Sequence, residues 1–108
     1  MSKTLAASIV VLLATGSFAQ ATVRNYFAPE QAGQRLDSCL TGASDCGKPA
    51  ADAFCKAQGF DTAILFQREA AAQTIRLGNG ASCTGPDCTS FRQIKCYATG
   101  DAVAAAPN

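Results

Sequence analysis

The residues of this chain that are best suited to chemistry are its six cysteines. Cysteine side chains can bind zinc, act as a redox dithiol, attack a substrate as a thiolate, or pair as structural disulfides. Zinc sites use closely spaced cysteine pairs, often with histidine, and redox dithiols use C-x-x-C. This chain has no histidine, and its cysteine pattern is C-x6-C-x8-C-x27-C-x4-C-x7-C. The sequence therefore predicts no metal site and favours three disulfides, made by Cys39, Cys46, Cys55, Cys83, Cys88 and Cys96.

Loop length favours one pairing among the many that six cysteines allow. Cys39–Cys46 and Cys83–Cys88 would close short glycine-containing loops, where closure costs little entropy. Cys55–Cys96 would then join the clearest helix to the last strand. Disulfides suit a chain of this size, because a small exported domain has too little core to be stable without covalent links.

The residue types argue against catalysis. Without histidine, a serine or cysteine nucleophile lacks its commonest base. The carboxylates are scattered along the sequence, and a chain this short has little room for the substrate cleft of a two-carboxylate glycosidase. Gly78-Asn79-Gly80 is not a phosphate-binding loop, since no Gly-Lys-Ser/Thr follows it. We therefore expect no enzyme, no catalytic residues and no cofactor.

Residues 1–21 have the features of a secretory signal peptide. Lys3 supplies the positive start, an uncharged apolar run follows, and Ala19-Gln20-Ala21 has the small-x-small form of a cleavage site. The uncharged run is shorter than the roughly 20 residues that span a bilayer. We therefore expect cleavage at this site, a secreted or periplasmic mature protein, and no stable membrane insertion after cleavage.

The charge balance argues against strongly charged partners. The chain has 9 basic and 8 acidic side chains, and loss of Lys3 with the leader leaves the mature domain neutral. Its basic residues are spread along the chain, and the best candidate group is Arg92 and Lys95 with Tyr97 on one strand, which is more typical of a solvated strand face. Nucleic-acid binding needs clustered basic residues with stacking aromatics. We therefore expect no nucleic-acid partner.

One helix is strongly predicted, over Pro49–Gln58. Proline suits the first helical turn, and the alanines that follow are strong helix formers. Phe54 and Cys55 lie on the face that points inward. Gly59 is placed to end the helix in a left-handed conformation, and we expect an exposed ion pair between Asp52 and Lys56.

Four segments are predicted as strands. Val23–Phe27 is a short run ended by proline and reads as an edge strand, while the continuous apolar residues of Thr62–Gln67 predict a central strand buried on both faces. Thr74–Leu77 is a further short strand, and Phe91–Ala98 alternates as a half-buried strand does. Glu69–Gln73 could form one helical turn.

These elements predict a small disulfide-linked α+β domain at residues 22–98, with a flexible tail at residues 99–108. One helix would pack on a three- to four-stranded, mainly antiparallel sheet. The Gly78-Asn79-Gly80 run predicts a turn.

The function that these features favour is a non-catalytic binding module with an unknown extracytoplasmic ligand, which could be a glycan, a protein or a small molecule. The loop closed by Cys83 and Cys88 is the predicted contact surface, because a loop held by a disulfide loses less entropy on binding. The polar and aromatic residues in or near it that could contact a ligand are Asn79, Thr84, Asp87, Thr89 and Tyr97.

The alternative is a secreted inhibitor or effector that acts on a protein target through the Cys83–Cys88 loop. Shape distinguishes the two classes of ligand. A concave polar and aromatic patch would favour a glycan or a small molecule, and a protruding loop would favour a protein.

Overall fold

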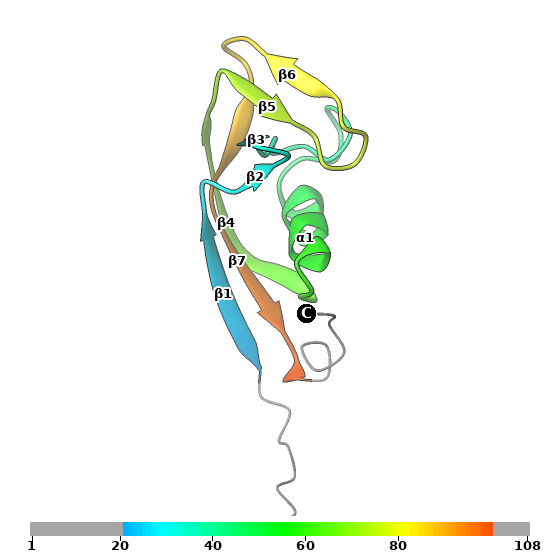
Figure 1. Cartoon of the computed structure of the whole chain (residues 1–108), viewed down its shortest axis with the longest axis vertical. Coiled ribbons are helices and arrows are strands. Elements are labelled where there is room, and N and C mark those ends of the chain that lie inside the picture. Colours follow the sequence, from blue (N-terminus) through cyan, green and yellow to red (C-terminus); the bar gives the residue numbers. More distant parts are fainter. Residues whose placement is uncertain (1–20, 101–108) are drawn as a thin grey trace, which may run out of the picture.

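The main sheet has three antiparallel strands in the order β1-β7-β4, and one helix, α1, lies against one of its faces (Figure 1). The strands are β1 (Thr22–Phe27), β4 (Thr62–Ala70) and β7 (Thr89–Ala98), and the helix is Lys48–Ala57. The computed structural model describes residues 21–100 of the chain. The predicted signal peptide and the tail from residue 101 lie outside the described residues.

Two small two-stranded sheets extend one end of the molecule. One pairs β2 (Glu30–Gln31) with β3 (Gln34–Arg35), and the other pairs β5 (Gln73–Ile75) with β6 (Ser82–Thr84). The predicted small α+β fold with one helix on a mainly antiparallel sheet is thus confirmed. The short strand predicted near Thr74 exists, but it pairs with β6 and not with the main sheet.

The central strand β7 has the alternation that its sequence predicts. Ile94, Cys96 and Ala98 are buried beneath the helix, and the intervening Lys95 and Tyr97 are partly exposed on the opposite face. Phe91 is fully buried and meets Phe66 of β4 edge to face. These side chains, with those of the inward face of α1, form the core.

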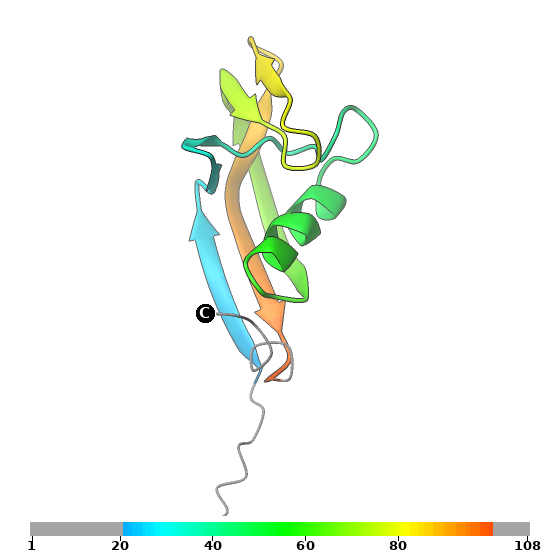
Figure 2. The same cartoon turned by 45° about the vertical axis from the view of Figure 1, so that its right-hand side comes forward.

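The prediction that the Thr62–Gln67 segment is a central strand buried on both faces is wrong. It belongs to β4, which is an edge strand, and its Ile64 and Leu65 are 52% and 39% exposed. With a single helix, only one sheet face can be covered, as Figure 2 shows. A bulge between Ala63 and Leu65 brings the extra apolar residue out of the core. The helical turn expected at Glu69 does not form, because β4 continues to Ala70.

The helix begins and ends where the sequence indicates. Pro49 lies in its first turn, and Gly59, with φ of 93°, follows its last residues. The backbone N–H of Phe60 donates to Cys55 O at 2.9 Å, and that of Gly59 donates to Lys56 O at 3.0 Å. These two bonds are the Schellman arrangement that the glycine predicts.

Asp52 joins the helix to the edge strand β4 through hydrogen bonds. Its Oδ1 accepts a hydrogen bond from the backbone N–H of Ala63 at 2.7 Å and another from Thr62 Oγ1 at 2.8 Å. Its ionic partner is Lys48, at 3.0 Å, and Lys48 also donates to Ala63 O at 3.2 Å. The expected pair with Lys56 is therefore wrong: Asp52 pairs with Lys48, one turn earlier in the helix, and both side chains bond to the backbone of Ala63.

Stability should depend on the charge of Asp52. Partial burial raises the pKa of its carboxyl group, but the bonds from Ala63, Lys48 and Thr62 outweigh this and hold the pKa below its ordinary value of 3.8. A group with a depressed folded pKa contributes stability above its unfolded pKa and loses it as the pH falls through the folded value.

We therefore expect Asp52→Asn to lower the free energy of unfolding by about 1 kcal/mol near pH 7. The difference from the unmodified protein should shrink below pH 3.8. Urea unfolding at both pH values measures it, with Asp87→Asn at an exposed site as the control. A difference between Asp52→Asn and the unmodified protein that stays constant with pH would contradict this role.

All six cysteines are paired as disulfides. The pairs are Cys39–Cys46, Cys55–Cys96 and Cys83–Cys88, the same three that loop length favours. Within residues 21–100, no helix is long and apolar enough to cross a membrane. Three disulfides in so small a domain are typical of proteins that fold in an oxidising compartment.

Candidate functional site

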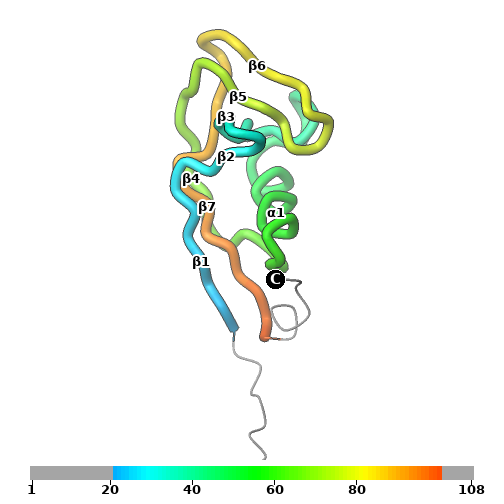
Figure 3. The backbone as a smooth tube through the Cα atoms, viewed as in Figure 1, coloured from blue at the N-terminus to red at the C-terminus, as the bar shows by residue number. Residues whose placement is uncertain are grey.

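The β5–β6 hairpin and the loop that follows it form one end of the molecule (Figures 1 and 3). Cys83 lies on β6 and Cys88 just before β7, so their disulfide ties the hairpin to the start of the central strand. Two backbone hydrogen bonds join the loop to the residues between β4 and β5. Gly85 N donates to Ala72 O at 2.9 Å, and Ala71 N donates to Cys88 O at 3.1 Å. The tip is therefore exposed but fixed in position.

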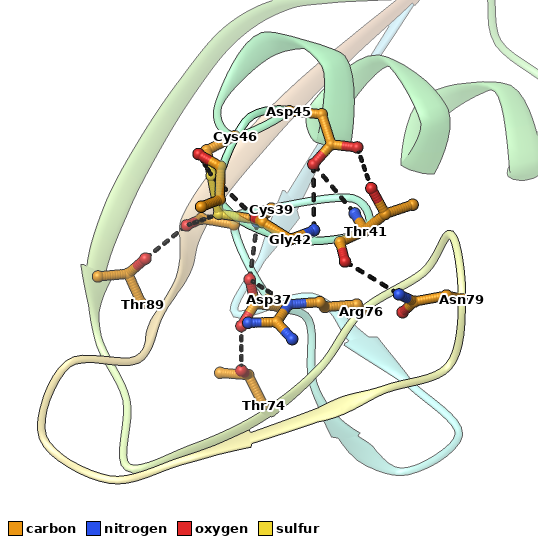
Figure 4. The surroundings of a disulfide bond; sticks show 12 residues. Asp37, Cys39, Thr41, Gly42, Asp45, Cys46, Thr74, Arg76, Asn79 and Thr89 are labelled. Atoms are coloured by element: carbon orange, nitrogen blue, oxygen red, sulfur yellow. Dashed lines mark hydrogen bonds and ion pairs between the residues drawn. A yellow bond between two sulfur atoms is a disulfide. The ribbon is translucent and has the colours of Figure 1, made fainter.

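A buried carboxylate, Asp37, anchors this end to the rest of the fold (Figure 4). It accepts hydrogen bonds from the backbone N–H of Cys39, at 2.8 Å, and from the hydroxyl of Thr74. Arg76 Nε lies 3.8 Å from its Oδ1. The backbone N–H of Asp37 also donates to Ile75 O at 2.8 Å. One side chain thus joins the Cys39–Cys46 loop to β5.

The Cys39–Cys46 loop has its own internal carboxylate, Asp45. It accepts the backbone N–H groups of Thr41 and Gly42, at 3.1 and 3.2 Å, and the Thr41 hydroxyl (Figure 4). The side-chain bond from Thr41, and then its backbone bond, lower the pKa of Asp45 from 3.8. The carboxylate is therefore ionised at neutral pH, and it holds the backbone of Thr41 and Gly42 inside the disulfide-closed loop.

A second turn packs against this loop. The backbone N–H of Gly78 donates to Leu40 O at 2.9 Å, and a Cβ at Gly78 would lie 2.7 Å from that same oxygen. Asn79 Nδ2 donates to Thr41 O, and Asn79 Oδ1 accepts the backbone N–H of Ala81, both at 2.9 Å. The predicted turn at Gly78-Asn79-Gly80 is confirmed, and only glycine fits its first position.

The five predicted contact residues do not form one patch. Thr84 and Asp87 are exposed at the tip of the loop and make no side-chain hydrogen bond within the described residues. Asn79 is exposed, but both ends of its amide are used inside the fold. Thr89 is partly buried, and its hydroxyl is hydrogen-bonded to Ser38.

The fifth residue, Tyr97, lies far from the loop. It is eight residues along β7 from Thr89, which is about 27 Å in an extended strand. It faces Val23 on one side and Thr62 on the other. Tyr97 therefore belongs to the uncovered face of the sheet and not to the disulfide-closed end.

Sequence reasoning missed Asp37, Asp45, Thr74 and Arg76, which hold this end together. One local signal was present: Asp37 bonds to the backbone two residues on, the Asx turn typical of aspartate in loops. The contacts to Thr74 and Arg76 join segments far apart in the sequence, and no local pattern reports them.

No group of three or more His, Cys, Asp or Glu side chains comes together as a metal site in the part of the chain that the structure describes. What this end offers a ligand is the exposed side chains of Thr84, Pro86 and Asp87 on a loop whose backbone is fixed. Recognition there would depend on shape and hydrogen bonds, with one carboxylate as the charged contact.

Comparison with known proteins finds no relative of this chain. No protein-family description matches the chain, and neither a curated protein nor a solved structure is significantly similar to it.

Proposed function

We propose that the protein is an exported, non-catalytic binding module whose partner is a protein. The observation that carries this proposal is the form of the Cys83–Cys88 loop, which projects from the end of the molecule with Thr84, Pro86 and Asp87 exposed. A projecting tip that is already fixed loses little entropy when it enters a partner's surface.

The composition of this end favours a protein over a glycan. No aromatic residue occurs between Phe66 and Phe91, and Phe91 is fully buried. The loop therefore has no flat aromatic face on which a sugar ring could stack. Proline, threonine and a single carboxylate are suited to a close fit against another protein's backbone and polar groups.

The second reading, a secreted inhibitor or effector, uses the same loop. Four residues between Cys83 and Cys88 are few for a substrate-like segment, so such an inhibitor would act as a wedge that blocks a cleft. A panel of extracytoplasmic hydrolases assayed with and without the protein separates this reading from simple attachment.

The test uses Asp87→Arg, which reverses the charge at the tip, and Glu30→Arg as a matched reversal on exposed β2. Each protein is immobilised and exposed to proteins of the native extracytoplasmic compartment. We expect a partner that the unmodified protein and Glu30→Arg retain equally and that Asp87→Arg binds at least about tenfold more weakly.

Equal retention by Asp87→Arg would show that the contact surface lies elsewhere. Retention of no protein, together with binding to a glycan array, would overturn the proposed class of partner. Turnover of a substrate by the purified protein would overturn the non-catalytic role.

A further inference from the structure

The two edges of the main sheet differ in how they are protected. On the β4 edge, the backbone N–H and C=O of Ala63 are bonded to Asp52 and Lys48 of the helix, and two register shifts interrupt the pairing of β4 with β7. Bulges and covered backbone groups are the usual means by which a sheet edge avoids further pairing. The β4 edge is therefore less suited than the β1 edge to pairing with another strand.

The β1 edge has none of these protections. Its pairing with β7 runs without a register shift from Thr22 to Phe27, and no described element lies beyond it (Figure 2). The backbone N–H of Ala28 donates to Arg92 O, which places Ala28 on the β7 side of the ladder. Because such bonds alternate along an antiparallel strand, Val23, Asn25 and Phe27 direct their backbone N–H and C=O groups to the open edge.

Four residues of the same strand are exposed: Val23 and Phe27 are apolar, and Arg24 and Asn25 are polar. Val23 and Phe27 are 50% and 69% exposed on the sheet face that the helix leaves uncovered. Unpaired backbone groups beside exposed apolar side chains form a template for another strand.

We infer that this edge pairs with the β1 strand of a second copy of the chain, antiparallel, with Asn25 opposite Asn25. The residues of each β1 strand whose backbone groups face the open edge must lie opposite one another in the two copies, and few registers satisfy this condition. Centring the pair on Arg24 would place two guanidinium groups face to face. Centring it on Tyr26 would oppose Val23 to Pro29, which has no N–H to donate.

The register centred on Asn25 is self-complementary. It opposes Val23 to Phe27 twice on the uncovered face, and Arg24 to Tyr26 twice on the helix face. An aromatic side chain opposite a β-branched one is a favourable cross-strand pair. Arg24 already lies 5.5 Å from the ring centre of its own Tyr26, so the same cation–π contact can form between the copies.

The predicted dimer is a continuous six-stranded sheet with the strand order β4-β7-β1-β1-β7-β4. Its two outer edges are the protected β4 strands, so pairing stops at two copies. The uncovered faces of the two copies, with Ile64, Leu65 and Tyr97, join into one surface. The equal numbers of basic and acidic side chains expected after leader removal oppose this association only weakly.

Sedimentation of the disulfide-bonded protein, from low micromolar to near-millimolar concentration, tests the inference. We expect a reversible monomer–dimer equilibrium with no larger species. Phe27→Lys should weaken the dimer at least about tenfold. Asn25→Pro should do the same without unfolding the domain, because the N–H that it removes points away from β7. Ile64→Lys, at an exposed apolar site on the β4 edge, is the matched control and should leave the dimer unchanged.

Amide hydrogen exchange at each concentration locates the contact. The N–H groups of Val23, Asn25 and Phe27 should become protected as the dimer forms, while those of Thr22 and Arg24 should already be protected in the monomer. A protein that stays monomeric throughout overturns the inference. So does a dimer that Ile64→Lys disrupts and Phe27→Lys does not, since it would use another surface.

Discussion

Replacing both Cys55 and Cys96 by alanine is expected to cause the largest loss of stability of any disulfide removal in this protein. The bond joins the helix to the central strand across a sequence separation of 41 residues, against 7 and 5 for the other two. Closure entropy rises with loop length, so this disulfide contributes about 4 kcal/mol and the shortest about 2 kcal/mol. Both sulfurs are also fully buried, and alanine leaves a void in the core.

Thermal unfolding followed by circular dichroism measures the effect. We expect Tm to fall by at least about 15 °C for the Cys55→Ala, Cys96→Ala double variant, and by about 10 °C for the matched Cys83→Ala, Cys88→Ala double variant. Double variants are used because a single replacement leaves a thiol that can pair wrongly. Equal shifts of Tm in the two variants would show that neither loop length nor core burial determines how much each disulfide contributes to stability.

Replacing Asp37 by alanine is the second change with a large expected effect. Its side chain is 3% exposed and accepts bonds from Cys39 N and the Thr74 hydroxyl, with Arg76 nearby. Removing the carboxylate leaves those buried donors unsatisfied and a positive charge without its partner. We expect the free energy of unfolding to fall by about 3 kcal/mol.

Urea unfolding of Asp37→Ala measures this loss, and Asp37→Asn, which retains one acceptor oxygen, should lose about half as much. Asp87→Ala at the exposed tip is the matched control and should change the free energy by less than about 0.5 kcal/mol. If Asp37→Ala and Asp87→Ala unfold at the same urea concentration, Asp37 does not anchor this end of the molecule.

The elements that were predictable are those whose signals are local. Pro49 and Gly59 mark the ends of the helix through backbone geometry alone, and the alternation from Ile94 to Ala98 reports a strand with one buried face. Loop length was also enough to favour the observed disulfide pairs, because the two short loops close at low entropic cost.

The position of β4 was not predictable in this way. A continuous apolar run such as Ala63–Phe66 is typical both of a strand buried on two faces and of an edge strand with a bulge. The difference depends on how many layers the whole fold has, and a chain with one helix covers one face only. The same limit explains the buried acid at residue 37, because its partners, Thr74 on β5 and Arg76 just after β5, lie far along the sequence.

The order of strands in the main sheet also has a consequence for synthesis. The middle strand, β7, is the last to be made, and both of its neighbours precede it in the chain. Until β7 has left the ribosome, β1 and β4 lack their partner in the main sheet, and Cys55 lacks its disulfide partner, Cys96. A chain that lacks β7 therefore cannot form the main sheet, because the sheet depends on contacts between distant parts of the sequence. That delay suits a protein with a predicted export leader, since a chain that has not yet folded can still be threaded through a membrane channel.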